Sequence, residues 1–148
     1  MTQAPLTEEV LNKIRTLQAE IDQIQANLST IEQQLAILGN AVESLQDATD
    51  IHDVLKTKVS GDEILIPIGG ACFIRCRIEN PNEIFLSLGS GVSIETDLEN
   101  AKTRTLTQID NIQKSSTQLQ NQYSQYSQLL ETKRDNLVTL AQQYGLIQ

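Results

Sequence analysis

The sequence has very few aromatic residues, prolines and glycines. Aromatic residues make up 3% of the 148 residues, there is no Trp, and the chain has only 7 Gly and 3 Pro. Most of the Gly and Pro residues lie between positions 61 and 91. Such a composition gives little material for a thick globular core, and long stretches without helix breakers favour helices that bury a narrow apolar seam.

Clusters of basic residues and long apolar runs are also missing. The net charge is −8 and no group of Lys and Arg is large enough to neutralise a phosphate backbone, so we expect no nucleic-acid partner. The first ten residues lack a basic and then apolar signal region, and no run approaches the roughly 18 apolar residues of a membrane span. These features predict a cytoplasmic protein without a membrane partner.

The chain has little with which to build a catalytic or metal centre. His52 is the single histidine, and Cys72 and Cys76 are the two cysteines. Spaced four apart on a strand, the cysteines would be roughly 13 Å apart, too far for a disulfide, so we expect reduced, half-buried thiols. A metal site joining them to His52 would lack the close spacing of zinc folds. We therefore predict no metal, no cofactor, no enzymatic activity, and a solvated His52.

The N-terminal part carries an uninterrupted heptad pattern. Steps of four and three residues alternate along eleven apolar positions, which only a 3.5-residue repeat against a partner helix explains. Thr7 followed by two acids is a plausible helix start. The pattern predicts a coiled-coil helix over residues 1–58 that leaves its partner after Leu45, where Thr49 and His52 interrupt the repeat. The apolar positions are Val10, Ile14, Leu17, Ile21, Ile24, Leu28, Ile31, Leu35, Leu38, Val42 and Leu45.

The C-terminal part, residues 97–148, repeats the pattern from Leu98 to Ile147. Its predicted start is a capping box, in which Thr96 and Glu99 satisfy each other's backbone donors. The stretch 115–128 is rich in Ser, Gln and Asn and could instead be disordered, but the heptad phase continues through it. We therefore predict a second coiled-coil helix.

The two heptad patterns can be aligned as an antiparallel pair. If the numbers of facing residues sum to 154, Ile24 faces Leu130 and Ile31 faces Tyr123, and every a position meets a d position. Sums of 147 or 161 keep the same phase. The sum of 154 is preferred because it also brings the two chain ends together.

Between the helices, in residues 59–96, the apolar period changes to two. The pattern predicts strands at 64–68, 71–78, 83–88 and 92–95, separated by turn sequences. The fold class is therefore α+β: a long antiparallel two-helix coiled coil with two β-hairpins inserted between the helices, forming one domain overall.

Hairpins with one apolar face are marginally stable alone, and their open edges recruit other strands. We therefore predict that the β block mediates oligomerisation. The alternative is a four-stranded cap that packs on its own helices. The predicted assembly residues are Ile64, Ile66, Ile68, Cys72, Ile74, Cys76, Ile78, Ile84, Leu86, Leu88, Val92 and Ile94.

Residues 63–101 resemble the corresponding part of an α-type prefoldin subunit, most closely the archaeal form. The resemblance rests on Ile66-Pro67-Ile68-Gly69, on Gly89-Ser90-Gly91 and on Ile94-Glu95, together with the presence of two hairpins. The chain departs from the family pattern at Val92-Ser93, where an aromatic pair or Gly-Tyr is commoner, and in its two cysteines.

The resemblance implies an ATP-independent holdase that captures unfolded polypeptides and transfers them to a group II chaperonin. It also implies a hexamer of two α and four β subunits whose hairpins form an oligomeric β-barrel platform. The implied partners are therefore β-type prefoldin subunits, a second α subunit, non-native polypeptides and the chaperonin. A structural or adaptor coiled coil that docks a fixed partner through its β block remains the alternative function.

In a prefoldin-like arrangement, substrate contact would lie at the ends of the coiled coil. Leu6, Leu11 and Leu146 lie off the seam, where they can offer apolar surface to a non-native chain. The alternative is that the apolar end residues only complete the seam. The predicted substrate-binding residues are Leu6, Val10, Leu11, Ile14, Leu140, Tyr144, Leu146 and Ile147.

Overall fold

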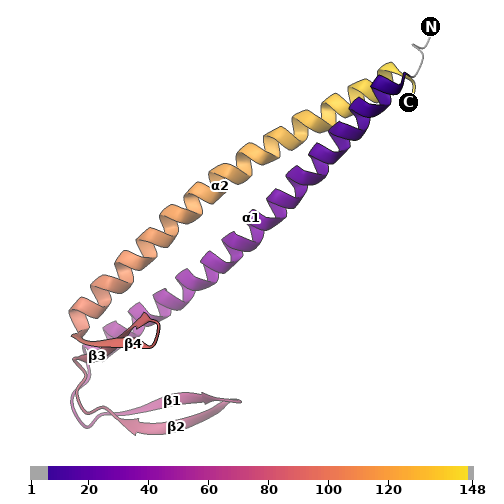
Figure 1. The fold of residues 1–148 in the computed structure, drawn as a ribbon. Helices are drawn as coiled ribbons and strands as arrows, with labels where there is room; N and C mark the ends of the chain where they lie inside the picture. The colour runs from indigo at the N-terminus through magenta and orange to yellow at the C-terminus, as the bar shows by residue number, and fades with distance from the viewer. Residues whose placement is uncertain (1–6, 147–148) are drawn as a thin grey trace. The chain divides into compact units, whose positions relative to one another are not determined.

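The computed structural model describes residues 7–146 and contains two long helices with two β-hairpins between them in sequence (Figure 1). The predicted α+β fold class and the order of its elements are confirmed. Stretch 115–128 is helical, so the alternative of a disordered segment is wrong. None of the described helices is long and apolar enough to cross a membrane. The elements are α1 (Glu8–Leu55), β1 (Glu63–Gly69), β2 (Cys72–Arg77), β3 (Glu83–Gly89), β4 (Val92–Asp97) and α2 (Leu98–Gln143).

The chain forms two compact units. One, here called the helical unit, combines Met1–Gly39 with Lys114–Gln148, and the other, the hairpin unit, is Asn40–Gln113. Both helices continue from one unit into the other, since α1 and α2 each span a boundary. The hairpin unit therefore contains all four strands together with the end of α1 and the start of α2.

In the helical unit, α1 and α2 pack along the predicted seam. The most deeply buried side chains come from α1, and two cross-helix hydrogen bonds fix the alignment: Tyr123 Oη donates to Glu32 Oε1 at 2.7 Å, and Lys133 Nζ to Glu20 Oε2 at 2.6 Å. The paired numbers sum to 155 and 153, which agrees with the predicted register of 154 and not with 147 or 161. The buried seam residues are Ile21, Ile24, Leu28 and Ile31.

The helical unit also contains the end of α2. Gly145 has a φ of 67°, and Leu146 N donates to Ala141 O at 2.9 Å while Gly145 N donates to Gln142 O at 3.0 Å. This pair of bonds is a Schellman motif, which uses a left-handed residue to satisfy the last helical carbonyls. The helix therefore ends at Gln143, and Leu146 follows it as an exposed side chain.

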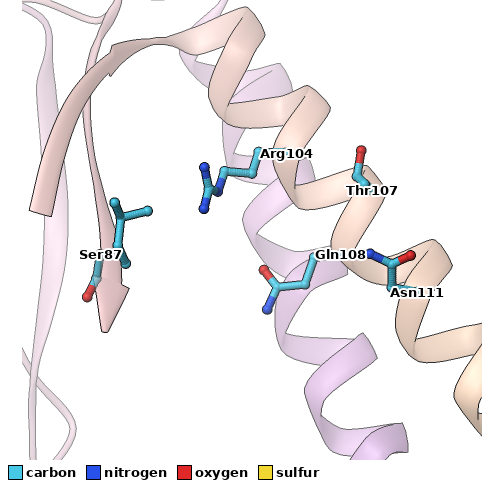
Figure 2. A pocket seen from close by; sticks show the side chains of 6 residues that line it. Ser87, Arg104, Thr107, Gln108 and Asn111 are labelled. Carbon is cyan, nitrogen blue, oxygen red and sulfur yellow. The ribbon is translucent and has the colours of Figure 1, made fainter. Parts of the chain in front are cut away.

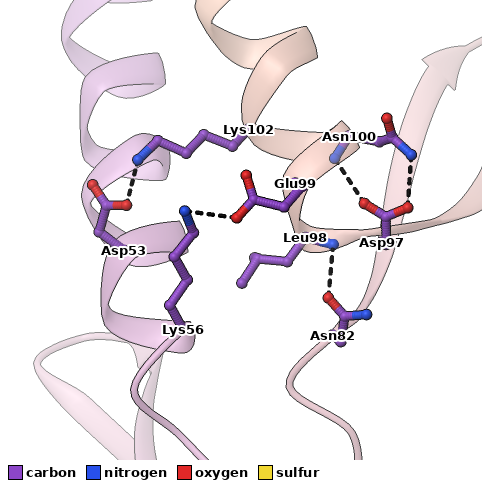
Figure 3. Close-up of polar contacts among 8 residues, drawn as sticks. All are labelled: Asp53, Lys56, Asn82, Asp97, Leu98, Glu99, Asn100 and Lys102. Carbon is purple, nitrogen blue, oxygen red and sulfur yellow. Dashed lines mark hydrogen bonds and ion pairs between the residues drawn. The ribbon is translucent and has the colours of Figure 1, made fainter.

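In the hairpin unit, the two helices remain paired beyond Leu45. Lys56 Nζ lies 2.7 Å from Glu99 Oε1, and Lys102 forms an ion pair with Asp53 (Figure 3). These numbers again sum to 155. The prediction that α1 leaves its partner after Leu45 is wrong, because the seam continues with buried residues such as His52 and Ala101, and the two ion pairs flank it.

The start of α2 differs from the predicted capping box. Thr96 pairs with Ile84 in the β3–β4 ladder, so the strand continues to Asp97 and the helix begins at Leu98. Asp97 Oδ1 accepts a hydrogen bond from Asn100 N at 2.8 Å, and Asn82 Oδ1 accepts one from Leu98 N at 3.3 Å (Figure 3). Asp97 is therefore the capping residue, and Asn82 satisfies a second free donor.

Each hairpin is a separate two-stranded antiparallel sheet, β1 with β2 and β3 with β4. The register shifts near both tips, between Pro67 and Gly69 and between Ser87 and Gly89. Residues 69–71 and 89–91 all have positive φ, a conformation that explains the glycines in the two turns. The structure therefore contains two independent hairpins and not one four-stranded sheet.

Candidate assembly and binding surfaces

One side of each hairpin is aliphatic. Ile64 lies opposite Cys76 and Ile66 opposite Ile74 in the first hairpin, and Leu86 lies opposite Ile94 in the second. Directly opposed residues share a face, so these pairs form continuous apolar strips. We call them the aliphatic faces. They consist of Ile64, Ile66, Ile68, Cys72, Ile74 and Cys76 in the first hairpin and Ile84, Leu86, Leu88, Val92 and Ile94 in the second.

The aliphatic faces are incompletely covered by the chain's own residues. In the first hairpin Ile66, Ile68 and Ile74 are 42%, 64% and 49% exposed. Leu88, Val92 and Ile94 of the second hairpin are also exposed, whereas Ile64, Ile84 and Leu86 are half-buried. Contiguous exposed apolar surface of this kind is typical of a protein–protein contact.

Ile78 belongs to the predicted assembly set but is already buried within the chain, at 9% exposure. Its N donates to Asp62 O at 2.9 Å and its O accepts from Gly61 N at 2.8 Å. These bonds tie the segment after β2 to the segment before β1. Ile78 therefore anchors the base of the first hairpin.

The two cysteines differ in burial. Both are free; Cys76 is half-buried as predicted, but Cys72 is exposed, so the prediction of two half-buried thiols is wrong for Cys72. The physical reason is its place beside the turn, where Gly70 and Ala71 offer no side chain large enough to cover it. No group of three or more residues suited to hold a metal ion occurs among residues 7–146.

The prediction of a solvated His52 is wrong. His52 is 8% exposed, and its Nδ1 atom is buried without a hydrogen-bond partner within the described part of the chain. Its place in the heptad explains this, because α1 and α2 stay paired here and Ala101 and Thr105 of α2 are buried too. His52 is thus a polar seam residue.

Ion pairs on the surface flank this buried histidine. The hydrogen bond from Lys102 lowers the pKa of Asp53 below its ordinary value, and the hydrogen bond to Glu99 raises the pKa of Lys56 (Figure 3). Both pairs therefore favour the charged forms at neutral pH. Being exposed to solvent, each contributes modestly to stability and mainly fixes the helix register.

Two grooves lie beside the hairpins. The first, of about 490 Å³, runs between the end of α1 and β1 and has mostly apolar walls, including Ile51, Val54, Leu55 and Ile66. The second, of about 460 Å³, separates β3 from α2 and is polar; Figure 2 shows Arg104 and Gln108 on the helical side of it, with Ser87 on the strand. The pattern of apolar residues in the sequence does not predict either groove. A groove depends on how far a helix lies from a hairpin in the folded chain, and the sequence pattern does not give that distance.

The predicted substrate-binding residues lie in the helical unit, except that Leu6 and Ile147 fall outside the described residues. Leu11 and Leu146 are 40% and 46% exposed, in keeping with their positions off the seam. Val10, Ile14, Leu140 and Tyr144 are half-buried. The ends of the helices therefore combine covered seam residues with a few exposed leucines.

The faces opposite the aliphatic ones contain residues that the sequence analysis did not select. Leu65, Phe73 and Phe85 are 65%, 61% and 67% exposed. Glu63 opposes Arg77 on the face that carries Phe73, and Glu95 opposes Phe85 on the other hairpin. The strict alternation of the strands could have identified this second pair of faces.

Tyr123 makes the stability of the helical unit depend on pH in the alkaline range. Its hydrogen bond to Glu32 raises the pKa of Tyr123 above the ordinary 10.0. Because the pKa is raised in the folded state, the contribution of this hydrogen bond to the free energy of unfolding is complete below pH about 10. It is lost as the pH rises through the higher pKa of the folded state. Melting temperatures measured by circular dichroism should therefore fall less steeply above pH about 10 in Tyr123→Phe than in the unaltered chain.

The matched control for this pH series is Tyr126→Phe, which removes a second half-buried seam tyrosine and leaves the Tyr123–Glu32 bond intact. This control should retain the part of the alkaline decline that comes from the Tyr123–Glu32 bond. Parallel pH curves for Tyr123→Phe and the unaltered chain would refute the assignment.

Comparison with known proteins gives a consistent family. The family model described as a prefoldin subunit matches residues 10–143. Prefoldin subunit alpha of Methanococcus vannielii is 27% identical over 135 residues, covering 89% of this chain and 86% of that protein. Prefoldin subunit alpha of Methanobrevibacter smithii is 25% identical, covering 88% and 90%.

Among solved structures, the filamentous PFD of Methanocaldococcus jannaschii is 23% identical, with a TM-score of 0.48, and the match covers 88% of this chain and 93% of that chain. The family match extends over both helices and both hairpins. Prefoldins are a class of chaperones. This chain, with its two helices and two hairpins, belongs to the prefoldin family.

Proposed function

We propose that this chain is the α-type subunit of an ATP-independent holdase, which captures unfolded polypeptides and transfers them to a group II chaperonin. The observation that carries the proposal is the pair of exposed aliphatic faces, which a chain of this family would cover with strands of other subunits. The names of the relatives, prefoldin subunit alpha, favour the α type.

The proposed assembly is a cytoplasmic hexamer of two α and four β subunits. In it, residues 59–96 form the assembly block and contribute strands to a shared β-barrel platform. Residues 1–58 and 97–148 form the coiled-coil arm. Because each strand of this chain has a hydrogen-bonded partner on one edge only, its other edge is available for strand addition.

We further propose that non-native chains bind at the ends of the helices. Leu11 and Leu146 are the exposed apolar side chains among the described members of the predicted set. A non-native polypeptide exposes apolar residues in many different sequences, so scattered exposed leucines suit a binding surface that has to be unselective.

The test combines the chain with a β-type prefoldin subunit. Native mass spectrometry should detect a complex of two α and four β subunits, and that complex should delay aggregation of a chemically denatured protein without added nucleotide. Leu11→Ser with Leu146→Ser should weaken this protection severalfold without changing the mass, since neither leucine is in the buried seam.

The control is a pair of substitutions at exposed helix positions away from the ends, Gln33→Ser with Gln34→Ser. Unaltered protection by the leucine variant would refute the placement of the substrate contact. An adaptor coiled coil would be indicated by a complex that forms with a fixed partner and gives no protection against aggregation.

A further inference from the structure

The two phenylalanines of the chain are both on the hairpins, and both lie opposite the aliphatic faces. Phe73 is 61% exposed and Phe85 is 67% exposed. If other strands cover the aliphatic faces, these two rings still point away from that contact. Aromatic residues are enriched in the cores of protein–protein interfaces, so an exposed aromatic ring on the surface of a sheet indicates a contact surface.

The face around Phe73 is basic. By register it consists of Glu63, Leu65, Pro67, Phe73, Arg75 and Arg77. Glu63 Oε2 lies 3.6 Å from Arg75 and Glu63 Oε1 lies 3.3 Å from Arg77, so one carboxylate is shared by two guanidinium groups. The arginine side chains are 72% and 75% exposed, which leaves net positive charge beside the ring.

The face around Phe85 is acidic. By register it consists of Glu83, Phe85, Ser87, Ser93, Glu95 and Asp97. Asp97 caps α2, and within residues 7–146 no Lys or Arg is paired with Glu83 or Glu95. The Phe85 face therefore carries three carboxylates and no basic residue.

We propose that the Phe73 face of one copy of this chain docks on the Phe85 face of a second copy. The two faces are complementary in charge, and each places one aromatic ring among charged residues. They do not cover each other within one chain, because both rings remain largely exposed there. In a two-fold arrangement the contact occurs twice: the Phe73 face of each copy packs on the Phe85 face of the other.

The inferred contact is small. A seven-residue strand is about 23 Å long, so each two-stranded face covers roughly 220 Å², and the four faces of the two contacts together bury roughly 900 Å². That is below the roughly 1,200 Å² of a stable complex. The contact alone therefore gives a weak self-association, which is measured at high protein concentration and weakens further as salt screens the charges. It does not depend on the aliphatic faces.

Two charge-reversed forms of the full chain test the exchange. Form one carries Glu63→Lys, Arg75→Glu and Arg77→Glu, which keeps the ion pairs inside the hairpin with their signs reversed. Form two carries Glu83→Arg and Glu95→Arg. In form one both contacting faces are acidic, and in form two both are basic, so each form alone should self-associate at least about tenfold more weakly than the unaltered chain.

Mixing the two forms should restore association, because the acidic faces of one then meet the basic faces of the other at both contacts. Sedimentation velocity and energy transfer between differently labelled forms measure this at about 50 mM and about 500 mM salt. Circular dichroism establishes that each form is folded, as expected for substitutions at exposed positions. Equal association of each form with itself and with the other overturns the proposal.

A third chain, Ile66→Asp with Ile74→Asp, separates this contact from the aliphatic faces. It should lose binding to a β-type subunit and retain the salt-sensitive self-association. Loss of both would overturn the proposal, since the self-association would then depend on the aliphatic faces. Failure of the unaltered chain to bind a β-type subunit would contradict the proposed function alone, because the mixing result does not depend on that subunit.

Discussion

Replacing Ile66 and Ile74 by Asp is expected to abolish assembly with a β-type subunit, lowering the affinity by more than about a hundredfold. The two isoleucines face each other across β1 and β2 in the middle of an aliphatic face. Burying a carboxylate without a partner costs several kcal/mol, so two of them prevent any strand or side chain from covering the face.

The same substitutions should leave the chain itself folded. Ile66 and Ile74 are 42% and 49% exposed, so the chain alone gains little from burying them. Size-exclusion chromatography with light scattering measures the assembly, and circular dichroism measures the fold. Gln33→Asp with Gln34→Asp adds the same charge at exposed positions of α1 and should assemble normally. A hexamer that tolerates the aspartates would place the assembly surface elsewhere.

The helix pairing could be predicted from the sequence because it follows from a repeat. Eleven consecutive apolar positions determine which face of α1 is buried, and the matching pattern in α2 determines the phase. The choice among registers could only be weighed by aligning the ends, whereas the Tyr123–Glu32 and Lys133–Glu20 bonds specify it in the structure. Their partners Glu32 and Glu20 lie beside the seam, at positions that the apolar heptad pattern does not describe.

The start of α2 and the burial of His52 were both predicted wrongly for one physical reason. Each prediction used residues close in sequence, whereas contacts with residues far along the chain determine the structure there. Thr96 followed by Glu99 fits a capping box, but pairing with Ile84 keeps Thr96 in the strand and leaves Asp97 as the cap. His52 interrupts the apolar repeat, which predicts a solvated side chain, but α1 and α2 stay paired around it, as the ion pair between Asp53 and Lys102 shows. Neither partner is close in sequence.

The sequence pattern identifies only one of the two surfaces that we propose for assembly. Alternation identified the aliphatic faces because nearly all of their residues are apolar; Thr96, opposite Ile84, is the polar exception. The opposite faces mix Phe73 and Phe85 with charged residues, and their significance depends on the register that places Arg75 and Arg77 beside Glu63. Alternation assigns these residues to the second face of each strand, but only the pairing of the strands shows which charged residues are neighbours.

Ile24→Ala should destabilise the helical unit by about 2–5 kcal/mol, the usual range for truncating a buried isoleucine. Ile24 is 6% exposed in the seam of the helical unit, where Ile21 and Leu28 are buried as well. A two-helix seam is one layer thick, so no second layer of side chains can move in to fill the space. Urea denaturation followed by circular dichroism measures the loss as a lower midpoint with a similar slope.

Ile37→Ala is the matched control, because it makes the same substitution in the same helix and in the same unit. Ile37 is 66% exposed and lies off the seam, so its truncation should change stability by no more than about 0.5 kcal/mol, with the higher helix propensity of Ala acting in the favourable direction. Equal losses for the two variants would mean that Ile37 is covered in solution, and a face of α1 outside the seam would then belong to an interface.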